Sequence, residues 1–134
     1  MISHPKIEFS GPRTSTVYIL NPRRHTIEKI RVDDCAITSG MRCDWMARTT
    51  GASPEEIYIE LKGAGRLPKA VQQLEESVNK LSIDVAKCKK RCLVVCSSMS
   101  LVSTTLQQCK AKFKNKYNAR LLTVRNCSEI RLDG

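Results

Sequence analysis

The chain has 134 residues, and 23 lysines and arginines against 13 aspartates and glutamates give it a net charge of +10. This length favours a single domain over residues 1–134. With no run of 18 apolar residues and no apolar signal-peptide core at the N-terminus, the sequence predicts neither a membrane-spanning helix nor secretion. We therefore expect a cytoplasmic protein without a membrane partner, whose 7 cysteines are reduced thiols.

The positive charge is concentrated in the second half of the chain. Residues 1–67 carry ten basic and eight acidic side chains, whereas residues 68–134 carry thirteen and five. A chain this basic favours an anionic partner, and nucleic acid, most simply DNA, is the first candidate. A solvated surface that only aids solubility is the alternative. Aromatic residues make up 4% of the chain, which does not suggest stacking platforms for single strands.

The first half of the chain predicts strands. Residues 1–16 contain prolines, a glycine and several hydroxyl side chains, and we expect an irregular N-terminal arm or a short edge strand there. Alternating and apolar runs predict strands over residues 16–20, 27–38, 42–48 and 57–62. Ser39-Gly40 is a turn signal between the second and third of these strands, and residues 49–56 are expected to form a loop.

The second half predicts helices alternating with strands. Apolar residues at helical spacing predict a helix over residues 67–81, and Pro68 suits its first turn. Residues 91–97 are predicted to form a strand buried on both faces, and a second helix should begin at Ser103 or Thr104 and end at Tyr117. Terminal strands are predicted at 119–125 and 128–132. The order predicts an α/β fold with a mixed central sheet and flanking helices, in which a crossover helix makes the fourth strand parallel to one inside the sheet.

Acidic and basic side chains meet at the end of the strand predicted over residues 57–62. Alternation places Glu60 and Lys62 on one face, and Asp44 lies sixteen residues upstream in another predicted strand. Two carboxylates brought together can hold a hard cation such as Mg²⁺ or Mn²⁺. A lysine beside them can orient or activate a water, which suits phosphodiester hydrolysis. An ordinary surface ion pair is the alternative.

Asp44 is followed by Glu60-x-Lys62 and then by an amphipathic helix with a glutamine near its start. This pattern resembles the PD-(D/E)XK nuclease superfamily over roughly residues 27–98. The chain also resembles short bacterial and phage-type proteins with a YIELKG...A..QL signature. The resemblance implies a restriction-endonuclease-like core, βββαβ with an additional αβ unit, and metal-dependent cleavage of DNA. It implies that Asp44, Glu60 and the Leu61 carbonyl bind Mg²⁺ or Mn²⁺, and that Lys62 positions the attacking water. Gln72, early in the helix, would reach the lysine or the scissile phosphate, unless it belongs to a solvated face.

The chain departs from the superfamily pattern in its upstream acid. Many active members carry a glutamate on a helix before the first core strand, and no helix is expected before Ile27. Glu28 is one candidate for the additional acid and Asp34, beside Asp33, is another. Cys43 stands where other members have proline. Loss of the additional acid leaves open a one-metal site or an inactive one.

Two lysine-rich segments are candidates for binding the phosphate backbone of a nucleic acid. They contain Lys87, Lys89, Lys90 and Arg91, and, on the second predicted helix, Lys110, Lys112, Lys114 and Lys116. Such contacts bind without reading sequence and weaken with salt. The alternative to a nuclease is a catalytically inactive nuclease-fold module that binds nucleic acid or a partner protein and regulates it. A homodimer or a place in a larger complex also remains open. The spacing of Cys88, Cys92 and Cys96 is not that of a zinc site.

Overall fold

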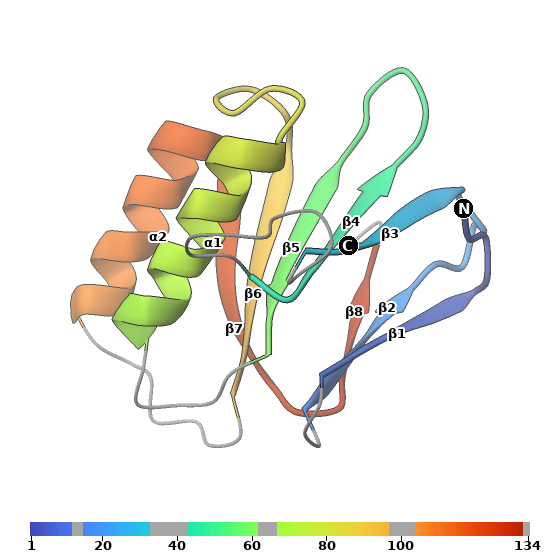
Figure 1. Ribbon diagram of the computed structural model, residues 1–134, viewed down its shortest axis with the longest axis horizontal. Helices are drawn as coiled ribbons and strands as arrows, with labels where there is room; N and C mark the ends of the chain where they lie inside the picture. The colour runs from blue at the N-terminus through green and yellow to red at the C-terminus, as the bar shows by residue number, and fades with distance from the viewer. Residues whose placement is uncertain (12–14, 33–42, 62–66, 97–103, 133–134) are drawn as a thin grey trace.

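Strands dominate the first half of the chain, and helices alternate with strands in the second. The computed structural model describes residues 1–11, 15–32, 43–61, 67–96 and 104–132. In order, the elements are β1 (Lys6–Ser10), β2 (Thr16–Leu20), β3 (Ile27–Arg31), β4 (Trp45–Thr49), β5 (Glu56–Glu60), α1 (Leu67–Leu81), β6 (Lys90–Cys96), α2 (Thr104–Tyr117), β7 (Ala119–Arg125) and β8 (Ser128–Arg131). They form an α/β structure with two mixed sheets (Figure 1).

The larger sheet has five strands in the order β3-β4-β5-β6-β7. β3, β4 and β5 are antiparallel neighbours, whereas β6 runs parallel to β5 and β7 runs parallel to β6. Helix α1 connects β5 to β6, and α2 connects β6 to β7. The expected crossover to a parallel fourth strand is confirmed. In the parallel part of the sheet, each strand therefore ends where the following helix begins.

Both helices cover the same face of the five-stranded sheet (Figure 1). The residues of α1 at helical spacing, among them Leu74 and Val78, are buried as predicted, and they pack with Tyr58 and Cys92 of the sheet. On α2, Phe113 and Tyr117 belong to the same core. Their ring centroids are 5.4 Å apart, and the rings meet edge to face. The apolar face of each helix thus packs on this side of the sheet.

A second sheet covers the opposite face. Its order is β1-β2-β8, with β1 antiparallel and β8 parallel to β2. Side chains such as Phe9, Val17 and Ile19 pack there against Ile59 and Leu93. The two predicted strands nearest the termini are present, but they build this separate sheet and do not extend the central one.

Of the two expectations for residues 1–16, the short edge strand is confirmed, because β1 lies at the edge of the three-stranded sheet; the irregular arm is wrong. The run Lys6-Ile7-Glu8-Phe9-Ser10 alternates, and its burial alternates with it: Ile7 and Phe9 are buried whereas Lys6 and Glu8 are exposed. This period-2 pattern outweighs the flanking proline and glycine. β3 ends at Arg31, and residues 33–38 of the strand predicted over residues 27–38 lie outside the described residues.

Candidate functional site

The register of β4 and β5 brings Asp44 and Glu60 together. Asp44 directly precedes β4, and Glu60 is the last residue of β5. Because Trp45 pairs with Ile59, the next pair outward is Asp44 and Glu60. The Asp44 N–H donates to the Ile59 carbonyl at 3.0 Å, which continues the ladder to this pair. Two carboxylates therefore leave neighbouring segments at the same level of the sheet.

A single backbone N–H contacts both carboxylates. The Leu61 N–H donates to Asp44 Oδ2 at 2.8 Å and to Glu60 Oε1 at 3.2 Å. Two oxygens this close to one nitrogen lie no more than about 6 Å apart, given normal hydrogen-bond lengths. A hard cation binds oxygens at roughly 2.0–2.6 Å, so two oxygens bound to one cation lie at most about 5 Å apart. The upper limit for the Asp44 and Glu60 oxygens is close to this value, so the pair is a candidate for sharing one cation. The Leu61 side chain is buried on the opposite face, among the residues that pack against the second sheet.

The pair lies at the edge of the core. The Glu60 side chain is 0% exposed and Asp44 is half-buried. Among the described residues, no group of three or more histidine, cysteine, aspartate or glutamate side chains is placed to hold a metal. The described part of the site therefore supplies two carboxylates. Two residues expected to complete it, Lys62 and Asp34, lie outside the described residues.

Cys43 links the carboxylate pair to helix α1. Its N–H donates to Ser77 Oγ at 2.8 Å, and the Ser77 hydroxyl donates to the Gln73 carbonyl at 2.8 Å. Burial raises the pKa of the Cys43 thiol to about 12; the hydrogen bond from Ser77 opposes this rise and the neighbouring Glu60 adds to it. A thiol with a raised pKa is a weak nucleophile at neutral pH, and the Cys43 side chain packs in the core beneath the helices.

The glutamine that α1 turns toward the sheet is Gln73. The predicted residue, Gln72, is exposed on the helix surface, whereas Gln73 is half-buried. Gln73 lies one helical turn before Ser77, and its Oε1 is buried without a hydrogen-bond partner among the described residues. The choice between two adjacent glutamines depends on the helical phase, and the buried positions Ala70, Leu74 and Ser77 set that phase.

The expectation that Glu28 adds an acid to the site is wrong. Glu28 pairs with Arg48 across β3 and β4, four residues along β4 from Asp44. At about 3.3 Å per residue, this places Glu28 roughly 13 Å away along the strand. Its carboxylate lies 4.0 Å from Arg48 Nη1. Glu28 therefore belongs to an ion pair at the opposite end of the sheet.

Glu56 is a buried carboxylate that the sequence does not single out. It is 0% exposed and accepts hydrogen bonds from the Tyr58 hydroxyl at 3.1 Å, the Ser82 hydroxyl at 2.6 Å and the Ile83 N–H at 3.0 Å. Arg48 donates to it from Nε at 3.2 Å and from Nη2 at 3.1 Å. These five donors occupy both oxygens, so Glu56 ties β4, β5 and the end of α1 together. In the run Glu-Ile-Tyr-Ile-Glu, alternation puts both glutamates on the helix-facing side, but it does not reveal their different partners.

Lys90 and Arg91 are wrongly predicted as phosphate contacts. Lys90 is 1% exposed, and its ammonium donates to the carbonyls of Asp84, Val85, Cys88 and Tyr117 at 2.6–3.0 Å. Arg91 is 4% exposed; it donates from Nε to Glu55 at 2.8 Å and from its Nη atoms to the carbonyls of Arg131 and Leu132. Both side chains use their donors inside the protein.

The other predicted phosphate contacts differ in their surroundings. Lys87, Lys89, Lys114 and Lys116 are exposed, as is Lys112, whereas Lys110 is half-buried. Lys112 Nζ lies 3.0 Å from Glu75 on α1, so a carboxylate already partners this ammonium. Within the described residues, Lys87, Lys114 and Lys116 have no carboxylate within ion-pair distance, and Lys89 has only the Glu55 carboxylate, at 3.9 Å.

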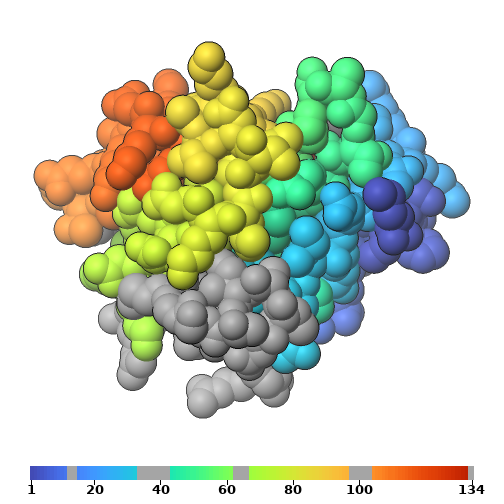
Figure 2. Space-filling view, turned by 45° about the horizontal axis from the view of Figure 1, so that its top comes forward, coloured from blue at the N-terminus to red at the C-terminus, as the bar shows by residue number. Residues whose placement is uncertain are grey.

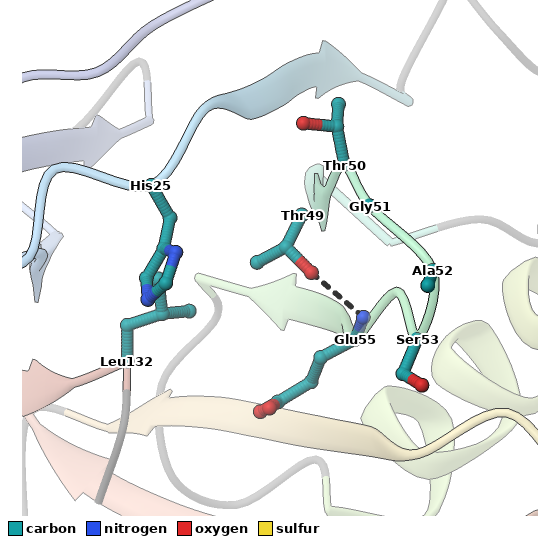
Figure 3. A pocket seen from close by; sticks show the side chains of 8 residues that line it. All are labelled: His25, Thr49, Thr50, Gly51, Ala52, Ser53, Glu55 and Leu132. Carbon is teal, nitrogen blue, oxygen red and sulfur yellow. Dashed lines mark hydrogen bonds between the residues drawn. The ribbon is translucent and has the colours of Figure 1, made fainter.

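A shallow hollow of about 340 Å³ lies away from the carboxylate pair. It is formed by the β4–β5 connection, with Thr49 and Glu55 on its wall, and by His25 and Leu132 (Figure 3). The Glu55 N–H donates to Thr49 Oγ1 at 2.8 Å, and the Glu55 carboxylate faces Arg91 Nη2 at 2.7 Å. Since β4 ends at Thr49, this hollow is at the opposite end of the strand from Asp44 and is not part of the candidate site.

Comparison with protein-family models, with curated proteins and with solved structures gives no match to this chain. Within the described residues, neither helix is long and apolar enough to cross a membrane.

Proposed function

We propose that this protein is a metal-dependent nuclease that hydrolyses phosphodiester bonds in DNA. The observation that carries the proposal is the Leu61 N–H, which lies within hydrogen-bond distance of carboxylate oxygens from both Asp44 and Glu60. In this proposal, the carboxylates of Asp44 and Glu60 and the Leu61 carbonyl bind Mg²⁺ or Mn²⁺. All three supply oxygen ligands, which these cations prefer.

The sheet topology supports a restriction-endonuclease-like core. Three antiparallel strands, β3, β4 and β5, are followed by α1 and by β6 parallel to β5, which is the βββαβ order of that core. The carboxylate pair lies at the carboxyl end of β5, on the side from which α1 begins. In α/β folds, this edge is a usual place for a site.

Each residue has a role in the proposed reaction. The bound cation supplies Lewis acidity toward the phosphoryl group and lowers the pKa of water. Asp44 and Glu60 hold the cation, and Lys62, next but one to Glu60 in the chain, orients the attacking water. We assign Gln73 in place of Gln72 as the helix residue of the site, an assignment supported by its buried Oε1, which has no partner among the described residues.

A catalytically inactive binding module is the second candidate. The described residues supply two carboxylates and no third acid, and Glu28 belongs to another cluster. Such a module would bind nucleic acid or a partner protein through its basic surface and would cleave nothing.

Plasmid nicking separates the two candidates. The purified protein is incubated with supercoiled plasmid and with single-stranded circular DNA, in Mg²⁺ and separately in Mn²⁺. The variants are Asp44→Asn and Lys62→Ala, and Glu28→Gln is the matched acid control from the opposite end of the sheet. We expect metal-dependent nicking by the wild type and the control, with at least a hundredfold loss in both site variants. Absence of nicking by the wild type in either metal would leave the binding module.

A further inference from the structure

Five exposed cations lie at one end of the molecule, which we call the basic end. Lys87 and Lys89 belong to the loop between α1 and β6, Lys114 and Lys116 to the last turn of α2, and Arg120 to the start of β7. The Asn118 side chain donates to the Lys87 carbonyl at 2.8 Å, and the Lys90 N–H donates to the Asn118 carbonyl at 3.1 Å. Figure 2 shows the surface of this loop, in yellow, continuous with that of α2, in orange.

Buried Lys90 holds the two lysine-bearing segments together. Three of the four carbonyls that accept from its ammonium, those of Asp84, Val85 and Cys88, are in the loop, and the fourth is that of Tyr117 at the end of α2. One cation therefore fixes the loop against the helix terminus. A surface fixed in this way loses little conformational entropy when it binds a ligand.

The lysine side chains of the basic end are mostly outside close ion pairs. Within the described residues, no carboxylate lies within ion-pair distance of the ammonium of Lys87, Lys114 or Lys116. Two acids are nevertheless close to this end: the Asp84 carboxylate accepts from the Lys87 N–H at 3.1 Å, and Glu75 interacts electrostatically with Lys116. Lys89 lies 3.9 Å from Glu55, which Arg91 contacts more closely at 2.7 Å. Lysines in the last turn of a helix are favoured by its dipole, which accounts for Lys114 and Lys116 but not for the two loop lysines.

The basic end and the carboxylate pair lie at opposite ends of the sheet. Lys90 pairs with Glu56 at the start of β5, whereas Glu60 ends that strand. The four steps between these glutamates span about 13 Å, more than the Debye length of roughly 8 Å at physiological salt. An anion bound at the basic end is therefore electrostatically separate from the carboxylates.

We infer that the basic end is a separate anchoring surface that holds the phosphate backbone of duplex DNA away from the Asp44–Glu60 pair. The identity of the ligand rests on the proposed function. Lysines act as point charges toward phosphates.

Double-stranded DNA fits better than a single strand, because the aromatic ring of the described residues at this end, Tyr117, is buried and offers no platform for a base. Ile83 is the large apolar side chain exposed here, at 56%, and one such residue does not make the apolar patch that a membrane surface requires.

The test is binding of a fluorescent 30-base-pair duplex in EDTA, followed by anisotropy over a range of salt concentrations, so that cleavage plays no part. Two variants remove cations from the basic end: Lys87→Gln with Lys89→Gln, and Lys114→Gln with Lys116→Gln. The control, Lys69→Gln with Arg125→Gln, removes the same charge from exposed positions at the opposite end of the sheet, at the start of α1 and the end of β7. Each basic-end variant should bind at least fivefold more weakly than the control, and the slope of log K against log salt should fall by about 2, since each phosphate contact contributes about 0.9.

Equal binding by the basic-end variants and the control would overturn the inference. So would absence of duplex binding at low salt, including the case in which the protein is retained by phosphatidylserine vesicles or by polyglutamate. Because these measurements are made without metal, they fail or succeed independently of the nicking assay. A protein that nicks plasmid but shows equal binding by all variants would retain its proposed function and lose the separate anchoring surface.

Discussion

Lys90 and Glu56 are buried charged side chains. Hydrogen bonds to protein groups take the place of the hydrogen bonds that each would make to water. The Lys90 ammonium has three N–H donors and four carbonyls around it. Glu56 accepts from Arg48, Tyr58, Ser82 and the Ile83 backbone. Burial of a charge is tolerated when its hydrogen-bonding capacity is used in full. Both residues join elements that are distant in sequence, which makes them structural.

Replacing Lys90 with methionine should destabilise the protein by about 3 kcal/mol, because buried carbonyls left without a donor each cost roughly 1–3 kcal/mol and some of these regain water. Urea unfolding followed by circular dichroism measures the difference. Lys89→Met is the matched control, since Lys89 is exposed and a surface change is expected to stay within about 0.5 kcal/mol. Equal stability of the two variants would show that the Lys90 ammonium does not hold the loop.

The sequence predicts the proximity of Asp44 and Glu60 but not which lysines are buried. Two carboxylates at facing strand ends follow from alternation and from a short hairpin, which are local properties. In the run Lys87-Cys88-Lys89-Lys90-Arg91, by contrast, burial is decided by where the run meets α2 and the C-terminal segment. No local pattern distinguishes Lys89 from Lys90, because their difference is a tertiary contact.

At the scale of elements, α1 and α2 are joined by a polar contact above the shared core. Glu75 of α1 accepts from the Tyr117 hydroxyl at 2.7 Å and from Lys112 Nζ at 3.0 Å. Burial alone raises the pKa of Glu75, but the hydrogen bonds from Tyr117 and Lys112 outweigh it, and the pKa of Glu75 is lowered. A carboxylate whose pKa is lower in the folded state stabilises the fold in its ionised form.

This contact should make stability depend on pH in the acid range. The contribution of Glu75 is fully present above the ordinary glutamate pKa of about 4.3 and is lost as pH falls through the lower pKa of the folded state. Glu75→Gln is therefore expected to lower the free energy of unfolding by about 1 kcal/mol at pH 7, and the difference from wild type should shrink toward pH 3. Urea titrations at pH 7, 5 and 3 measure it. Glu76→Gln, an exposed neighbour on α1, should show no such trend; a similar trend in both variants would contradict the role of Glu75.

Both helices are predictable to the residue, or nearly so, because their apolar spacing is long and regular. β1 is less predictable, because five alternating residues lie beside prolines and a glycine that favour irregular structure. β1 and β2 pair locally, but the pairing of β8 with β2 is non-local, across more than a hundred residues. An alternating pattern predicts that a strand forms, but it does not predict which sheet the strand joins.

At the scale of the whole molecule, the proposed function is divided between two ends of one sheet. The carboxyl end of β5 carries the Asp44–Glu60 pair, and the opposite end carries the lysines of the segments fixed by Lys90. The helices run in the same direction between these ends (Figure 1). The lysines of the basic end, a part of the excess positive charge of the second half of the sequence, thus lie away from the Asp44–Glu60 pair, which follows from the β-α-β connections.

The measurement that tests the proposed metal site most directly is Mn²⁺ binding, followed by electron paramagnetic resonance of the free ion. We predict that the wild type and Glu28→Gln bind Mn²⁺ at the Asp44–Glu60 pair, and that Asp44→Asn and Glu60→Gln each weaken this binding at least tenfold. Mg²⁺ should compete for the same site. Mn²⁺ binding that is unchanged in both site variants, or absent from the wild type at millimolar concentrations, would contradict the claim that these two carboxylates form a metal site.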